Sequence, residues 1–236
     1  MKRSSIESLI DTEALEAELE WLARVIELRL QHYFHEQHPA SPPLPGSLAP
    51  PPALAAKPGP YAAALQRHGL DADERLLMIL ALAPQLRPQL LDVLATLNPT
   101  TQRPYTEFGG QLGAGGVILP TVETACFLRA GDALAQRLRA LQDLALQQRL
   151  ARQDLLQAQP TGPDHGAGLL QAVLTPSAAF LAEALPAAQT GSALPCLADP
   201  RDALASRVSS GLGWGDLVLP AATLAQLEDI GLWLAH

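Results

Sequence analysis

Apolar residues recur at three- and four-residue steps near the start of the chain, which predicts one amphipathic helix over residues 5–36. The stripe consists of Leu15, Leu19, Leu22, Ile26, Leu30 and Tyr33. It continues for fewer than three heptads, and this length leaves two interpretations open. The helix either packs on its own domain or forms a short seam between copies of the chain. In both cases we expect residues 1–38 to form a separate N-terminal helix.

The next segment, residues 39–60, contains nine prolines. Proline lacks a backbone N–H and disfavours the helical conformation in the residue before it. We therefore expect an extended linker that detaches the first helix from the rest of the chain.

Residues 61–152 favour three short helices followed by a hairpin, which is the order of a winged-helix unit. The first helix is expected to end at Gly69, and the second to begin with Asp71 or Asp73 as its N-cap. A third helix is expected over residues 87–98. The β-favouring runs RPYTEF (103–108) and GVILP (116–120) then flank a glycine cluster, which predicts the hairpin.

Two further helices are expected behind this hairpin. Pro120 is placed in the first turn of a helix that Gly131 closes. A longer helix follows from Asp132 to about Arg149, because leucines recur there at helical spacing.

Residues 153–236 favour a second unit of similar type. Two short apolar runs, 154–159 and 168–174, surround a Gly/Pro turn, and a helix follows with Thr175 as N-cap and Pro176 at its first position. Two strands and an amphipathic helix over 221–236 complete the chain. The fold expected is mostly helical α+β, with two winged-helix-like units that carry short Gly-rich β-hairpins, and a detached N-terminal helix.

Composition narrows the classes of function. The chain carries a formal charge of −8 and only two lysines, Lys2 and Lys57, whereas duplex nucleic acid is bound mainly through Lys and Arg contacts to phosphate. Nucleic acid is therefore a poor candidate for a partner. No apolar run reaches the roughly 18 residues of a membrane span, and the N-terminus lacks the apolar region of a signal peptide. We expect no membrane association and a reducing, cytoplasmic location, since Cys126 and Cys196 form no disulfide framework.

The glycine cluster contains five glycines between Gly109 and Gly116, but it does not match a phosphate-binding loop. A Walker A loop requires a lysine, and none follows Lys57. The dinucleotide pattern G-x-G-x-x-G fails as well, because its third glycine would fall on Ile118. The cluster is therefore interpreted as a hairpin tip, and no cofactor is expected to bind it.

Other candidate chemistry is sparse. His32, His35 and Glu36 could form a weak metal site, but we favour a solvated helix end as the interpretation of these residues. Cys126 is expected to be a small core residue. Glu107 and Glu123 are expected to pair with Arg103 or Arg129 at the hairpin. No nucleophile or acid–base pair has a catalytic spacing, so we do not expect these 236 residues to be an enzyme.

Three stretches resemble the N-terminal region of bacterial AAA-type ATPases, including those encoded with extracellular contractile injection systems. They are NPTTQRPYTEFGG (98–110), ILPTVETACFLRAGD (118–132) and WGDLVLPAATLAQLEDIGLWLAH (214–236). In that group a winged-helix-type region precedes the ATPase core, and the Walker A loop follows some tens of residues later. Since this chain ends at His236, the resemblance implies a truncated or fragmentary parent that binds ATP and Mg, but none of the ATP-binding residues can be assigned here.

The resemblance implies a non-catalytic accessory domain. It would recognise a protein substrate or a particle component, dock on its own ATPase core, and join a hexamer through the parent. The residues expected to make contacts are Arg103, Tyr105, Glu107, Gly109, Gly110, Gly113, Gly115, Gly116, Trp214 and Asp216. Two alternatives remain: a winged-helix regulator that binds DNA, and a structural oligomerisation module that uses the first helix.

Overall fold

The computed structural model describes residues 11–35, 49–131, 134–146, 148–159 and 168–185. The chain divides into two compact units, 1–198 and 199–236. All described residues belong to the first unit. The strands and the helix expected within 207–236, together with Trp214 and Asp216, lie outside the described residues.

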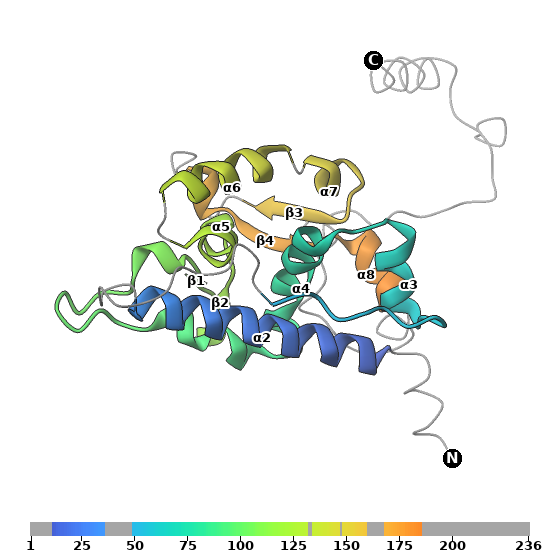
Figure 1. The fold of residues 1–236 in the computed structure, drawn as a ribbon, viewed down its shortest axis with the longest axis horizontal. Coiled ribbons are helices and arrows are strands. Elements are labelled where there is room, and N and C mark those ends of the chain that lie inside the picture. Colours follow the sequence, from blue (N-terminus) through green and yellow to red (C-terminus); the bar gives the residue numbers. More distant parts are fainter. Residues whose placement is uncertain (1–10, 36–48, 132–133, 147, 160–167, 186–236) are drawn as a thin grey trace, which may run out of the picture. The chain divides into compact units, whose positions relative to one another are not determined.

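The described part is a mostly helical α+β structure with seven α-helices and two small antiparallel sheets. The helices are α2 (Thr12–His35), α3 (Pro60–Arg67), α4 (Ala72–Leu86), α5 (Val122–Ala130), α6 (Leu134–Leu146), α7 (Gln148–Arg152) and α8 (Ala178–Ala184). One hairpin joins β1 (Gln111–Leu112) to β2 (Ile118–Leu119), and the other joins β3 (Leu156–Gln159) to β4 (Val173–Pro176). Figure 1 shows this arrangement.

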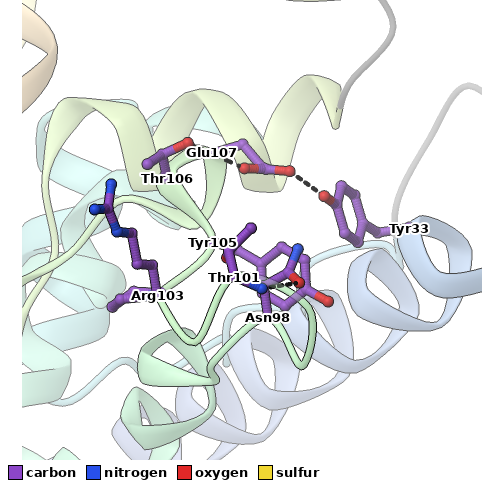
Figure 2. A pocket seen from close by; sticks show the side chains of 8 residues that line it. Tyr33, Asn98, Thr101, Arg103, Tyr105, Thr106 and Glu107 are labelled. Atoms are coloured by element: carbon purple, nitrogen blue, oxygen red, sulfur yellow. Dashed lines mark hydrogen bonds between the residues drawn. The ribbon is translucent and has the colours of Figure 1, made fainter.

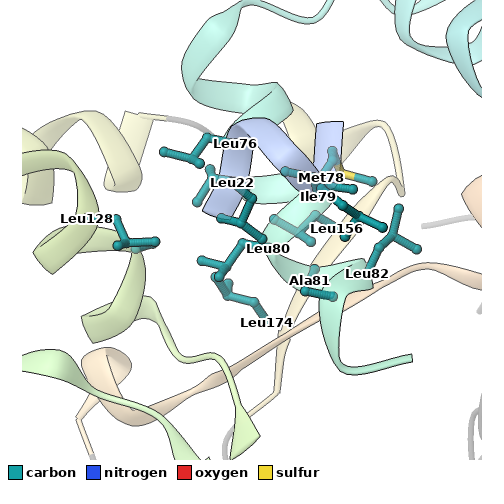
Figure 3. Packing of buried hydrophobic residues seen from close by; sticks show 14 of the residues in the cluster. Leu22, Leu76, Met78, Ile79, Leu80, Ala81, Leu82, Leu128, Leu156 and Leu174 are labelled. Atoms are coloured by element: carbon teal, nitrogen blue, oxygen red, sulfur yellow. The ribbon is translucent and has the colours of Figure 1, made fainter. Parts of the chain in front are cut away.

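Helix α4 forms the centre of the core. Every residue from Glu74 to Ala83 is buried, so this helix is covered on all sides. Its N-terminus is fixed by a capping box, in which the Asp71 carboxylate accepts from the Glu74 N–H and the Glu74 carboxylate accepts from the Asp71 N–H. Figure 3 shows side chains from α2, α4, α5, β3 and β4 meeting around it. One hydrophobic cluster extends from Leu15 to Leu185 and so includes residues of both predicted winged-helix-like units.

The expectation of a detached N-terminal helix is wrong. The apolar stripe of α2 packs on α4 and α5, and Leu22 and Val25 are completely buried. The leucine stripe and the apolar residues of α4 and α5 belong to one hydrophobic cluster. The stripe is therefore buried in its own unit.

The proline-rich segment, as far as it is described, is also part of the fold. The Trp21 indole N–H donates to the Ala49 carbonyl at 2.7 Å, and an Arg75 N–H donates to the Pro52 carbonyl at 2.7 Å. Proline removes a donor from the backbone but leaves its carbonyl acceptor, which Arg75 uses at Pro52. Ala49 and Leu54 pack partly buried against the core, whereas we had expected residues 39–60 to form a separating linker.

Three helix boundaries differ from the sequence-based expectation. Residues 87–98 form two short 3₁₀ turns, Pro88–Leu90 and Asp92–Ala95, because Pro88 forces Arg87 out of the helical conformation. Pro120 precedes the N-cap Thr121, so it does not lie in the first turn of α5. Helix α8 likewise begins after the N-cap Ser177, because Thr175 and Pro176 still belong to β4. The positive-φ Gly131 ends α5 as predicted.

The first hairpin forms, but from different residues. The expected strand 103–108 contains a 3₁₀ turn, Thr106–Phe108, and the first strand is Gln111–Leu112, inside the glycine cluster. The two hairpins are joined through an isolated bridge between Thr121 and Val173. The Val122 N–H donates to the Ala172 carbonyl, and the Leu174 N–H donates to the Pro120 carbonyl.

Candidate protein-interaction site

A closed loop over residues 97–104 precedes the first hairpin. The Asn98 carboxamide oxygen accepts from the Thr100 N–H at 2.9 Å, which is the bonding of an Asx turn. The Asn98 N–H donates to the Arg103 carbonyl at 2.8 Å, and Leu97 pairs with Pro104 where the loop closes. These bonds hold residues 98–104 in one conformation, so the side chains that follow are presented in fixed positions.

An aromatic cluster anchors the end of this loop. Of the chain's four Phe, three Tyr and three Trp residues, five gather here: Tyr33, Phe34, Tyr105, Phe108 and Phe127. The Tyr105 and Phe108 rings stack with centroids 4.8 Å apart, and the Tyr33 ring meets the Tyr105 ring edge to face at 5.7 Å. The cluster fixes the loop against α2 and α5, which lie far from it in sequence.

A surface pocket of about 520 Å³ lies beside this cluster (Figure 2). It is lined by Tyr33, Asn98, Thr101, Arg103, Pro104, Tyr105, Thr106 and Glu107. The Tyr33 hydroxyl donates to the Glu107 carboxylate, and the Thr106 hydroxyl donates to its other oxygen at 3.3 Å. Three of the residues expected to make contacts, Arg103, Tyr105 and Glu107, are therefore brought together in one hollow.

The glycines expected at the site have other positions. Gly109 has φ +65°, and a Cβ at this residue would lie 2.5 Å from the Thr124 backbone nitrogen, so Gly109 allows the capping turn of α5 to pack closely. Gly110 and Gly113 form the hairpin next to Ile118 and Leu119. Gly115 and Gly116 lie at its tip, with open space around them. None of these five glycines lines the pocket.

The ion pairs expected at the hairpin are replaced by others. Glu123 binds Arg137 of α6 at 2.7 Å, and Arg129 binds Asp73 of α4 at 2.5 Å. Both pairs join α5 to a neighbouring helix. Arg103 has no bond to Glu107, which leaves the pocket with a carboxylate that receives only hydroxyl groups from the described residues.

The structure supports the interpretation of Cys126 as a core residue. The thiol is completely buried in α5, and burial, aided by the charge of Glu123, raises its pKa to about 11. A thiol with this pKa stays protonated near neutral pH and is a poor nucleophile there.

Part of the predicted histidine site lies outside the described residues. His32 lies on α2, but the His35 side chain and Glu36 are outside the described residues. Within the described ranges, no group of three or more His, Cys, Asp or Glu residues could hold a metal ion. In the same ranges, no helix is long and apolar enough to cross a membrane.

Most of the arginines in the described ranges are engaged within the molecule. Six of them pair with carboxylates: Arg67 with Glu183, Arg75 with Glu18, Arg87 with Glu16, Arg129 with Asp73, Arg137 with Glu123, and Arg149 with Glu74. Helix α6, which follows α5 after residues 131–133, exposes apolar side chains instead. Leu134 is 70% exposed and Leu138 is 53% exposed.

Sequence reasoning missed Tyr33, Asn98 and Thr101 as pocket residues. Tyr33 was assigned to the apolar stripe of the first helix, and nothing local to it indicates a partner more than 70 positions away. Asn98 did carry a local signal, because Asn-Pro-Thr-Thr favours an Asx turn.

No protein-family model matches the chain, and comparisons with curated proteins and with solved structures find no significant similarity.

Proposed function

We propose that this chain is a protein-recognition domain and the non-catalytic accessory part of an AAA-type ATPase. The observation that carries the proposal is the pocket beside the aromatic cluster, where Arg103, Tyr105 and Glu107 converge. Aromatic and arginine residues are enriched at the centres of protein interfaces, and a rigid loop presents them without a large ordering cost. The partner would be a protein substrate or a particle component, and the setting would be the cytoplasm.

We infer in addition that α4, β2, α5, α6 and the β3–β4 hairpin form a winged-helix-type unit. Helices α5 and α6 contact each other and are separated only by residues 131–133, and a hairpin follows them. The bridge from Thr121 to Val173 brings the residues that follow β2 beside β4. The first hairpin would then lie outside the wing, in contrast to the order expected from sequence.

The helix-turn-helix arrangement of α5 and α6 favours a second candidate, a DNA-binding regulator. In such proteins the second helix enters the major groove and carries side chains that contact bases and phosphates. Here α6 exposes Leu134 and Leu138, and its Arg137 is paired with Glu123. These features support a protein partner over DNA.

Two experiments test the proposal. First, the coding sequence after His236 is read for G-x-x-x-x-G-K-[ST], which we expect within roughly 60 residues. The absence of such a loop would remove the ATPase assignment. Second, the purified chain is mixed with the ATPase core encoded there, and binding is followed by calorimetry. We expect binding at a fixed stoichiometry and no ATP hydrolysis by the chain alone.

A salt-titrated binding assay with duplex DNA separates the two candidates. Specific DNA binding would weaken steeply as salt rises, because phosphate contacts release counterions. We expect no such binding at physiological salt. Tight binding with a steep salt slope would favour the regulator and count against the accessory domain.

A further inference from the structure

Among the described residues, Glu107 lacks the arginine partner that every other buried or half-buried glutamate has. Glu18, Glu74, Glu123 and Glu183 each receive an arginine. The Glu107 carboxylate is half-buried at the pocket, and among the described residues it binds only the hydroxyls of Tyr33 and Thr106. These two donors orient the carboxylate, and no cationic group in the described part of the chain neutralises its charge.

The walls of the pocket suit a particular cation. The half-buried Tyr33 and Tyr105 rings lie beside Glu107, as Figure 2 shows, and Tyr105 is held flat against Phe108. A guanidinium group stacks on an aromatic face and also forms two parallel hydrogen bonds to a carboxylate. A lysine ammonium group cannot form this pair of parallel hydrogen bonds as well, because it is a compact and strongly hydrated point charge.

We propose that this pocket receives an arginine side chain of the partner protein, with Glu107 as its counter-ion and the tyrosine rings as its stacking surface. The inference rests on the proposed function, since it names the chemistry by which the protein partner is recognised. It also assigns roles within the pocket: Tyr33 is a positioning residue for the carboxylate, and Asn98 shapes the loop that carries Tyr105.

Arg103 and Glu107 should have opposite effects on the binding of a cationic group. It lines the same pocket but is exposed and forms no bond to Glu107, and in Figure 2 it lies on the opposite side of Tyr105 from Tyr33. An incoming arginine would be repelled by this guanidinium and attracted by Glu107. Neutralising Arg103 should therefore strengthen binding of a cationic group, whereas neutralising Glu107 should weaken it.

The test uses the whole 236-residue chain and two peptides that differ in one charge. Acetyl-Gly-Arg-Gly-amide and the same peptide with citrulline are titrated into isotopically labelled protein, and the amide signals of residues 98–110 are followed by NMR. We expect the arginine peptide to bind at least about tenfold more tightly than the citrulline peptide, as for other charge-assisted bonds. Equal affinity for the two peptides would overturn the proposal without any variant.

Variants then test whether Glu107 is the counter-ion of the bound arginine. Glu107→Gln should reduce the affinity for the arginine peptide to that of the citrulline peptide, while Arg103→Gln should raise it. Glu20→Gln, an exposed change on α2, is the matched control and should leave the affinity unchanged. Retained binding in Glu107→Gln, or tighter binding of acetyl-Gly-Glu-Gly-amide than of the arginine peptide, would contradict the proposal.

The outcomes also separate this inference from the proposed function. If the ATPase core binds the wild type and Glu107→Gln equally, the accessory function stands and the arginine site fails. If the arginine peptide binds as expected but no ATPase loop is encoded downstream, the site stands and the assignment to an AAA-type parent fails.

Discussion

Glu18 and Arg75 form the most deeply buried ion pair among the described residues. The Glu18 carboxylate accepts from two N–H groups of Arg75, and the Arg75 guanidinium also lies over the Trp21 ring, 5.9 Å from its centre. Burial raises the pKa of Glu18 above its ordinary value, and the hydrogen bonds and charge of Arg75 oppose this rise without cancelling it. The pair thus joins α2 to α4 at a net desolvation cost.

Replacing Arg75 should leave the buried Glu18 carboxylate unpaired and so lower the stability of the fold. We expect Arg75→Met to lower the free energy of unfolding by about 3–5 kcal/mol at neutral pH, because an unpaired carboxylate remains buried. Since the folded-state pKa of Glu18 is raised, the folded protein takes up this proton more readily than the unfolded chain. The loss should therefore shrink as pH falls through the raised pKa. Urea unfolding at pH 7 and pH 5 measures the difference. The double variant Glu18→Gln/Arg75→Met is the control and should lie close to the wild type at both values.

Two glycines of the cluster give a matched comparison at the same scale. Gly109 has φ +65° and ψ −151°, a region almost restricted to glycine, and a Cβ would overlap Thr124. Gly115 has φ +74° and ψ 8°, with nothing within 4 Å of a Cβ. We expect Gly109→Ala to cost about 3 kcal/mol and Gly115→Ala only about 1 kcal/mol. Denaturant midpoints of the two variants check this, and equal losses would show that Gly109 has no packing role.

At the scale of elements, helix ends are determined by local capping. We expect Asp71→Ala to destabilise the protein by about 1 kcal/mol, since the Glu74 N–H loses its acceptor at the start of α4. Asp71→Asn keeps a side-chain oxygen there and should lose only a fraction of this. Thermal unfolding followed by circular dichroism compares the two. A larger loss for Asn than for Ala would contradict the capping role.

The elements that sequence predicted well are those with local signals. Of the two N-caps considered, Asp71 and Asp73, the structure uses Asp71, and Gly131 ends its helix as predicted. Residues 103–108 have high β-propensity, yet the Asn98 turn and the packing of Tyr105 and Phe108 on Tyr33 decide their conformation. Such contacts between distant segments override propensity. Arg103, Tyr105 and Glu107 could be identified from sequence because they are neighbours along the chain. Tyr33 could not, because its contact with Glu107 joins residues 74 positions apart.

At the scale of the molecule, α2 belongs to the single core of the first unit. Arg29 of α2 also donates to the Leu128 and Arg129 carbonyls at the C-terminus of α5, where it satisfies acceptors that the helix leaves open. This helix therefore has two kinds of contact with the rest of the fold. A coiled-coil seam along its leucine stripe would require those leucines to leave the core.

Two leucines of α2 test this placement. We expect Leu22→Ala, at a completely buried position, to cost about 3 kcal/mol, and Leu28→Ala, at a position 38% exposed, to cost under about 1 kcal/mol. Both variants should unfold in one transition that circular dichroism and Trp fluorescence report identically. A separate early transition in Leu22→Ala would indicate that α2 folds independently of the rest.

The crossing between the two hairpins has a consequence for solvent access. The amide hydrogens of Val122 and Leu174 donate across this crossing, to Ala172 and Pro120, although neither bond belongs to the ladder of a hairpin. Breaking them requires α5 and β4 to separate, which is a global event and not the fraying of a short ribbon. In deuterium oxide these two amides should exchange as slowly as those of α4, and far more slowly than the amide of Gly116 at the first hairpin's tip.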